Sequence, residues 1–178
     1  MSRVKVRAYT SSSMVLLAFD WPDGNRYEDF LGYAISRQAG FDNQKFSWLP
    51  NRIGFDGPAK KDQVLRSNEN PIQKFLWWDA RFEQGTKPRP YLYTITPVRG
   101  TPDSLQHIDA DAGTIQITLA PSVDQGIGTY FNRAVVSSQA FAREFGRTLD
   151  EEMFDKAITW LANGIEKVIP EFLKNTPA

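Results

Sequence analysis

His107 is the only histidine of the 178-residue chain, and its imidazole offers the widest chemistry because it can bind zinc or transfer protons near neutral pH. Since the chain has no cysteine, a zinc site, a Ser-His-Asp triad or a His-based acid–base pair would all depend on this one residue. Its neighbours Asp103, Asp109 and Asp111 are carboxylates in predicted turns, and the last two lack the downstream Glu of a calcium loop. We therefore expect a solvated loop histidine, no metal site and no cofactor.

Two other groups of residues could do chemistry. Asp150, Glu151, Glu152 and Asp155 could supply the paired carboxylates of a glycoside hydrolase. They lie where a helix is predicted to begin, and the helix dipole favours negative charge there, so a structural role explains them better. The segment Gly126-Ile127-Gly128 precedes a predicted helix but lacks the Lys and Ser/Thr of a phosphate-binding loop. We predict that this chain has no catalytic residue and is not an enzyme.

The charge and composition of the chain exclude several classes of partner. The net charge is +0 and no basic block is longer than Lys60-Lys61, which argues against binding to nucleic acid or to an anionic membrane. No apolar stretch is long enough to span a bilayer, and the N-terminus lacks the apolar run of a signal peptide. We therefore expect a cytoplasmic protein with no membrane span.

The first predicted domain covers residues 1–121, where apolar and polar residues alternate in short runs between turn residues. This period of two is typical of half-buried β-strands. Further strands are expected around 46–48, 72–79 and 114–119, within or after a loop excursion over 41–71. The pattern predicts a mainly β fold, an antiparallel β-sandwich. The inward sets are Val4, Val6 and Ala8; Val15, Leu17, Phe19 and Trp21; Leu31, Tyr33 and Ile35; and Tyr91, Tyr93 and Ile95, with Thr94 and Thr96 facing outward.

The second predicted domain, 122–178, has the apolar spacing of two α-helices. The first is expected to extend from about Phe131 to Phe145, and the second to begin at a Thr148-x-x-Glu151 capping box. Pro170 should kink the second helix near its end. An apolar stripe about 27 Å long is predicted along this helix at about 1.5 Å per residue. Its members are Phe154, Ile158, Leu161, Ile165, Val168 and Phe172.

Trp77 and Trp78 are neighbours in a predicted strand, so their side chains should point to opposite faces of the sheet. One of the two indoles needs a cover other than the core. The C-terminal helices, the 41–71 excursion and an external ligand such as a sugar ring are all candidates. The helical stripe poses the same question, since it must dock on the outer face of a sheet or on something outside the chain. Trp77, Trp78 and the stripe are therefore the candidate interaction surface.

The first domain resembles a fibronectin type III or immunoglobulin-like module over roughly residues 3–120. The motif Phe19-x-Trp21-Pro22 is similar to the end of that fold's second strand, and the segment Leu31-Gly32-Tyr33-Ala34-Ile35-Ser36-Arg37 resembles its third. The sequence Asp79-x-x-Phe82-x-x-Gly85, followed by Tyr91-x-Tyr93, resembles the corner where a Tyr hydroxyl bonds back to the preceding turn. Which of the two tyrosines makes that bond stays open.

A second resemblance lies in the segment from Gly128 to Gly146, which is similar to the link between an N-terminal sandwich and the catalytic part in bacterial phospholipase D-like proteins. That family carries paired His-x-Lys-x4-Asp motifs. This chain has neither, because Asp109 takes the place of the Lys two residues after His107. The resemblance implies a non-catalytic N-terminal region, with any phosphodiesterase activity lying beyond Ala178.

Together these features predict an accessory region that positions or docks on a phospholipase D-like catalytic part of the same polypeptide, or on a protein partner. The alternative is a freestanding module that binds a glycan or a protein through exposed aromatic side chains.

Overall fold

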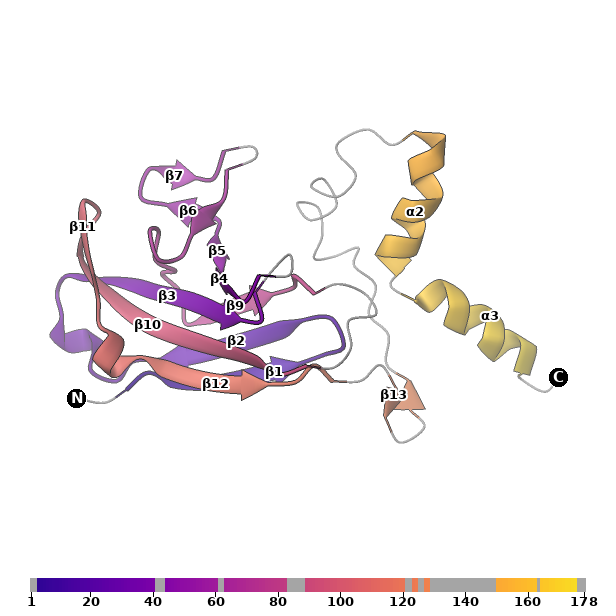
Figure 1. Cartoon of the computed structure of the whole chain (residues 1–178), viewed down its shortest axis with the longest axis horizontal. Coiled ribbons are helices and arrows are strands. Elements are labelled where there is room, and N and C mark those ends of the chain that lie inside the picture. Colours follow the sequence, from indigo (N-terminus) through magenta and orange to yellow (C-terminus); the bar gives the residue numbers. More distant parts are fainter. Residues whose placement is uncertain are drawn as a thin grey trace. The chain divides into compact units, whose positions relative to one another are not determined.

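The computed structural model describes residues 3–40, 44–60, 63–82, 89–120, 123–124, 127–128, 150–162 and 164–175. The chain divides into two units, Met1–Ala120 and Pro121–Ala178, which are described separately below. The prediction of a mainly β protein with antiparallel sheets and two C-terminal helices is confirmed (Figure 1).

The smaller sheet has the strand order β1-β2-β9, and its strands are antiparallel. Strands β1 (Lys5–Thr10) and β2 (Val15–Asp20) form a hairpin, and β9 (Leu76–Asp79) pairs with the other edge of β2. The alternation in the sequence is the reason for this geometry, because successive side chains of a strand point to opposite faces. On β2 the odd-numbered residues are buried and the even-numbered ones are partly or fully exposed.

The larger sheet has the order β11-β10-β3-β4, with β12 also paired to β10, and it curls into a half-barrel. Its strands are β3 (Phe30–Gln38), β4 (Phe46–Trp48), β10 (Tyr91–Thr101), β11 (Ser104–His107) and β12 (Gly113–Ile117). Two short 3-10 turns, η1 (Gly24–Arg26) and η2 (Asp109–Asp111), connect strands of this unit. The shorter β12 replaces the strand predicted over 114–119.

The two sheets share one hydrophobic core. Its members come from the inward-facing positions of both sheets, so the predicted inward sets are largely confirmed, with Val6 and Ala8 half-buried against the core. The inward assignment of Leu31 is wrong, because the pairing of β3 with β10 shifts register there and Phe30 packs against the core beside Tyr33 instead. Aromatic rings fill much of the volume, with Phe19 edge-on to Tyr33 and Trp21 stacked on Tyr27. The fully or nearly fully buried core residues include Val15, Leu17, Phe19, Trp21, Tyr33, Ile35, Tyr91, Tyr93 and Ile95.

The segment after β3 forms the expected excursion, but it contains more pairing than predicted. Strand β5 (Pro50–Asn51) pairs with β8 (Leu65–Arg66), and β6 (Ile53–Gly54) pairs with β7 (Gly57–Pro58). The segment also packs on the larger sheet, since the Ser67 Oγ accepts a hydrogen bond from the Ile35 N–H at 3.0 Å and the Asn68 carbonyl oxygen lies 3.0 Å from His107 Nε2.

This packing corrects two expectations. Thr96 was expected to face solvent, yet it is 3% exposed, and Ala34, its partner on β3, is fully buried. His107 is not a solvated loop residue, because it ends β11 and its Nε2 lies 3.0 Å from the carbonyl oxygen of Asn68. The outer face of the larger sheet is therefore partly covered by the chain itself.

The strand predicted over 72–79 begins only at Leu76. Ile72 instead makes an isolated bridge to Tyr33, with the N–H of each donating to the carbonyl of the other at 2.8 and 3.0 Å. This crossing passes close to Gly32, whose φ is +126°. A Cβ at Gly32 would lie 2.6 Å from the Ile72 carbonyl oxygen, so the residue without a side chain allows the bridge to form.

The second unit contains the pair β13 (Val123–Asp124) and β14 (Ile127–Gly128) and the helices α2 (Glu151–Ala162) and α3 (Ile165–Asn175). The expectation of one continuous helix over Phe154–Phe172 is wrong. Gly164 has a φ of 94° and separates the two helices, as glycine commonly does just after a helix end. Pro170 lies inside α3, and the helix continues past it to Asn175.

The N-terminal cap of α2 also differs from the expectation. Asp150 caps the helix, since its Oδ1 accepts a hydrogen bond from the Met153 N–H at 2.8 Å. The predicted helix over 131–145, its cap Gly146 and Thr148 lie outside the described residues. Among the described helices, neither is long and apolar enough to cross a membrane.

Candidate interaction surface

The outer face of the smaller sheet presents apolar side chains to solvent. Tyr9 of β1, Leu16 of β2 and Trp78 of β9 are paired across the three strands in one row. Tyr9 and Trp78 are each 57% exposed, and Leu16 between them is half-buried. Because neighbouring strands lie about 4.8 Å apart, the two aromatic residues stand about 10 Å apart along this row.

The neighbouring rows make the same face partly apolar and partly charged. Arg7, Ala18 and Leu76 form the next row, in which Leu76 is 54% exposed. Lys5 and Asp20 are paired in the row beyond it. The face is therefore aromatic at the end of the strands that holds Tyr9 and charged at the end that holds Lys5. We call the set Tyr9, Leu16, Ala18, Leu76 and Trp78 the aromatic face.

The structure separates the two neighbouring tryptophans as the strand geometry predicts. Trp77 is half-buried and packs against the core, opposite Leu17. Trp78 points the other way and belongs to the aromatic face. Of the two indoles, Trp78 is therefore the more exposed one, and the half-buried Trp77 lies on the opposite face of the sheet.

The predicted helical stripe lies in the second unit and is divided between two helices. Phe154 and Ile158 of α2 are 53% and 45% exposed, and Phe172 of α3 is 67% exposed. Leu161, Ile165 and Val168 are half-buried around the turn that joins the helices. Because the helix breaks at Gly164, the apolar residues form one side of α2 and one side of α3 instead of a continuous stripe.

Sequence reasoning missed four members of the aromatic face: Tyr9, Leu16, Ala18 and Leu76. The signal was present in the alternation of the first two strands. Tyr9 continues the outward set begun by Lys5 and Arg7, and Leu16 lies between the inward Val15 and Leu17. An apolar residue in an outward set is the feature that points to a surface rather than to a core.

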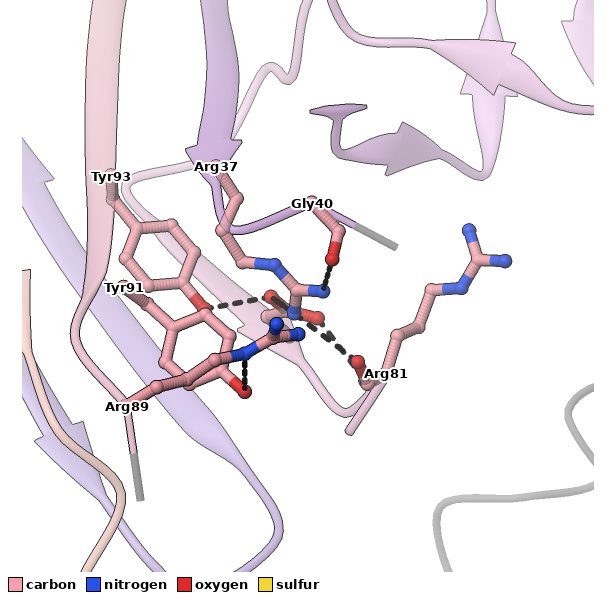
Figure 2. Close-up of polar contacts among 7 residues, drawn as sticks. Arg37, Gly40, Arg81, Arg89, Tyr91 and Tyr93 are labelled. Carbon is pink, nitrogen blue, oxygen red and sulfur yellow. Dashed lines mark hydrogen bonds and ion pairs between the residues drawn. The ribbon is translucent and has the colours of Figure 1, made fainter. Parts of the chain in front are cut away.

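A second site, a buried ion pair, closes the end of the core beside β9 (Figure 2). Arg37 of β3 donates from Nη1 to Asp79 Oδ2 at 2.8 Å and from Nη2 to the Gly40 carbonyl at 3.0 Å. The Tyr93 hydroxyl donates to the same Asp79 oxygen at 2.7 Å. The side chains of Arg37 and Asp79 are 2% and 0% exposed. Tyr93 is thus the tyrosine that bonds back toward β9.

Aromatic rings complete the surroundings of the Arg37 guanidinium. The guanidinium carbon lies 4.8 Å from the centroid of Phe82 and 5.2 Å from that of Tyr91. Arg89 donates from Nε to the Tyr91 hydroxyl at 3.2 Å (Figure 2). The pair is almost completely buried and links β3 and β10 of one sheet to β9 of the other, so we assign it a structural role.

Burial of two tyrosines predicts a loss of stability in alkali. Burial raises the pKa of Tyr33 from 10.0 to about 12, and burial together with the Asp79 charge raises the pKa of Tyr93 further. The unfolded chain then releases these protons first, so stability present below pH 10 is lost as the pH rises above it. Tyr33→Phe should reduce this loss by about 1.4 kcal/mol in total between pH 9 and pH 11. Urea unfolding of both proteins from pH 9 to pH 11 measures this difference. If the free energy of unfolding fell equally with pH in the wild type and in Tyr33→Phe, the prediction would be contradicted.

Metal chemistry finds no support in the described part of the chain, where no group of three or more His, Asp or Glu side chains could hold an ion. No family model matches this chain, and no curated protein matches it. The function must therefore be argued from the geometry of the surface.

Proposed function

We propose that this chain is a non-catalytic binding module that recognises its partner through the aromatic face. The observation that carries the proposal is the exposure of Trp78 and Tyr9, each 57%, in one row of a regular sheet. Tryptophan and tyrosine contribute strongly to binding because they bury a large apolar area with few rotatable bonds. Trp78 is not among the residues that pack against the hydrophobic core, whereas its neighbour Trp77 is.

We assign the first unit to the fibronectin type III or immunoglobulin-like sandwiches as part of this proposal. The support is the division of strands, with β1, β2 and β9 in one sheet and β3, β4, β10, β11 and β12 in the other around a shared core. The hydrogen bond from Tyr93 to Asp79 supports it as well. Fold alone implies no activity, so the binding role depends on the aromatic face.

The accessory role beside a phospholipase D-like part is the second element of the proposal. Its support is the sequence of the segment from Gly128 to Gly146 together with the single histidine. The structure adds that His107 Nε2 lies 3.0 Å from the Asn68 carbonyl oxygen and that its ring lies edge-on to that of Trp48, so the imidazole has structural contacts within the fold. The purified chain should not hydrolyse a phosphodiester such as bis-p-nitrophenyl phosphate, and robust hydrolysis would contradict this role.

The binding surface can be tested by cross-linking. A photoreactive phenylalanine analogue in place of Trp78 should give a discrete adduct when the full chain is expressed in its native cells. The matched control is the same analogue at Phe46, an aromatic on β4 that is 44% exposed and outside the aromatic face. Adducts at position 46 but none at position 78 would overturn the proposed surface.

A further inference from the structure

We propose that the ligand of the aromatic face is an extended glycan chain of neutral, β-1,4-linked sugars that crosses the strands along the row Tyr9–Leu16–Trp78. This inference rests on the proposed function and names the ligand class for the same surface. It is argued from the spacing of the row, the chemistry of its members and the charges beside it.

The spacing of the two aromatic residues fits a repeat of two sugars. Tyr9 and Trp78 lie two strands apart in the same row, at about 10 Å. In a β-1,4-linked chain each sugar is turned over relative to the next, so alternate sugars present the same face, and two units span a comparable length. One sugar can then stack on Tyr9 and the second following one on Trp78.

The residue between the two rings fits the intervening sugar. Leu16 is half-buried and apolar, so it offers a contact surface without competing for the hydroxyl groups at the sugar's edge. The axial C–H groups of a pyranose ring form apolar patches that pack on aromatic faces in the same way as other apolar surfaces. The row therefore alternates ring, aliphatic side chain and ring across three strands.

The charges beside the row fit a neutral ligand rich in hydroxyl groups. Lys5 and Asp20 are paired across β1 and β2, so their charges oppose one another within the face. Arg7 lies in the row next to Tyr9, and its guanidinium can donate to two adjacent hydroxyls. Arg7 has the apolar residues Ala18 and Leu76 as its row partners, so the charges of Lys5, Arg7 and Asp20 sum to only +1. A charge this small fits a neutral ligand whose hydroxyls accept hydrogen bonds better than a strongly charged partner.

Calorimetric titration of the full chain with cellohexaose and chitohexaose tests the inference, with maltohexaose as a control for chain shape. We expect binding to at least one β-linked hexamer and not to the curved α-linked one. Trp78→Ala and Tyr9→Ala should each weaken binding about tenfold or more, while Phe46→Ala leaves it unchanged. Shortening the ligand should show a sharp loss between the trisaccharide, which reaches both rings, and the disaccharide, which does not.

Each failure points to a different conclusion. If neither β-linked hexamer binds, or if the disaccharide binds as tightly as the hexamer, the glycan inference is overturned. The proposed function still stands in the first case if cross-linking at position 78 yields a protein adduct. If glycans bind but the Phe46 substitution weakens binding and the Trp78 substitution does not, both the inference and the proposed surface are wrong.

Discussion

Arg37→Ala is expected to lower the free energy of unfolding by about 3–5 kcal/mol, because it leaves the Asp79 carboxylate buried without its cation. The Asp79 side chain is 0% exposed, and among the described residues it would keep the Tyr93 hydroxyl and the Arg81 N–H as partners. Urea unfolding of the full chain, followed by tryptophan fluorescence, measures the loss. The total stability of a domain is only about 5–15 kcal/mol, so this variant should be among the least stable.

The matched control is Arg99→Ala, which breaks an ion pair of similar length in a more exposed place. Arg99 Nε lies 3.0 Å from Asp29 Oδ2, with the two side chains 34% and 39% exposed. Such a pair contributes about 0–1 kcal/mol. If Arg37→Ala does not fold, Tyr93→Phe provides a milder test, with an expected loss of about 1–2 kcal/mol for one buried hydrogen bond. Equal losses for Arg37→Ala and Arg99→Ala would contradict a structural role for the buried pair.

Gly32→Ala is expected to cost about 3 kcal/mol or more, since it combines two penalties. The φ of +126° is strained for any residue with a side chain, and the added methyl would meet the Ile72 carbonyl oxygen at 2.6 Å. The oxygen belongs to backbone that is held by the bridge to Tyr33, so it cannot move without breaking that bridge. Denaturant unfolding again measures the change.

Gly57→Ala separates the two penalties. Gly57 has a φ of +102°, but nothing lies within 4 Å of a Cβ built there. Gly57→Ala should therefore lower the free energy of unfolding by about 1 kcal/mol, from the strained backbone conformation alone. Similar losses for both variants would show that the crossing of residues 71–73 over β3 imposes no steric requirement at Gly32.

Local alternation was enough to predict much of the β unit. The inward residues of β2 and β10 were assigned correctly because each strand has one apolar set directed at a core, and on β3 only Leu31 was misassigned. The opposite orientations of Trp77 and Trp78 followed from the same rule. Alternation does not say what covers the other face of a sheet, so Thr96 was wrongly placed in solvent. That burial arises from long-range packing of the fold, which no local pattern records.

The errors in the helical unit have a different origin. Apolar spacing of three and four residues continues across Gly164, so periodicity alone predicted a single helix. The backbone decides otherwise, because Gly164 adopts a left-handed conformation that ends one helix before the next begins. The Asn163-Gly164 pair was the available signal for this end. Asp150 was likewise a cap candidate that the Thr148-x-x-Glu151 pattern obscured.

The sequence predicted the aromatic face only in part, because most of its members are brought together by strand pairing. Trp78 was identified as an adjacent partner of Trp77, whereas Tyr9 and Leu76 became members through strand pairing. Pairing of β1 with β2 is local, but pairing of β2 with β9 joins residues about sixty positions apart. A row that crosses three strands is therefore a property of the fold and not of any segment of the sequence.

The most direct measurement compares stability and binding for Trp78→Ala in one preparation of the full chain. If Trp78 serves binding, its removal should change the free energy of unfolding by about 1 kcal/mol or less, the range of strand preferences at an exposed site. Affinity for the β-linked hexasaccharide should fall about tenfold or more in the same sample. A loss of several kcal/mol in the free energy of unfolding, with affinity unchanged, would show that Trp78 stabilises the fold and would contradict the proposed binding face.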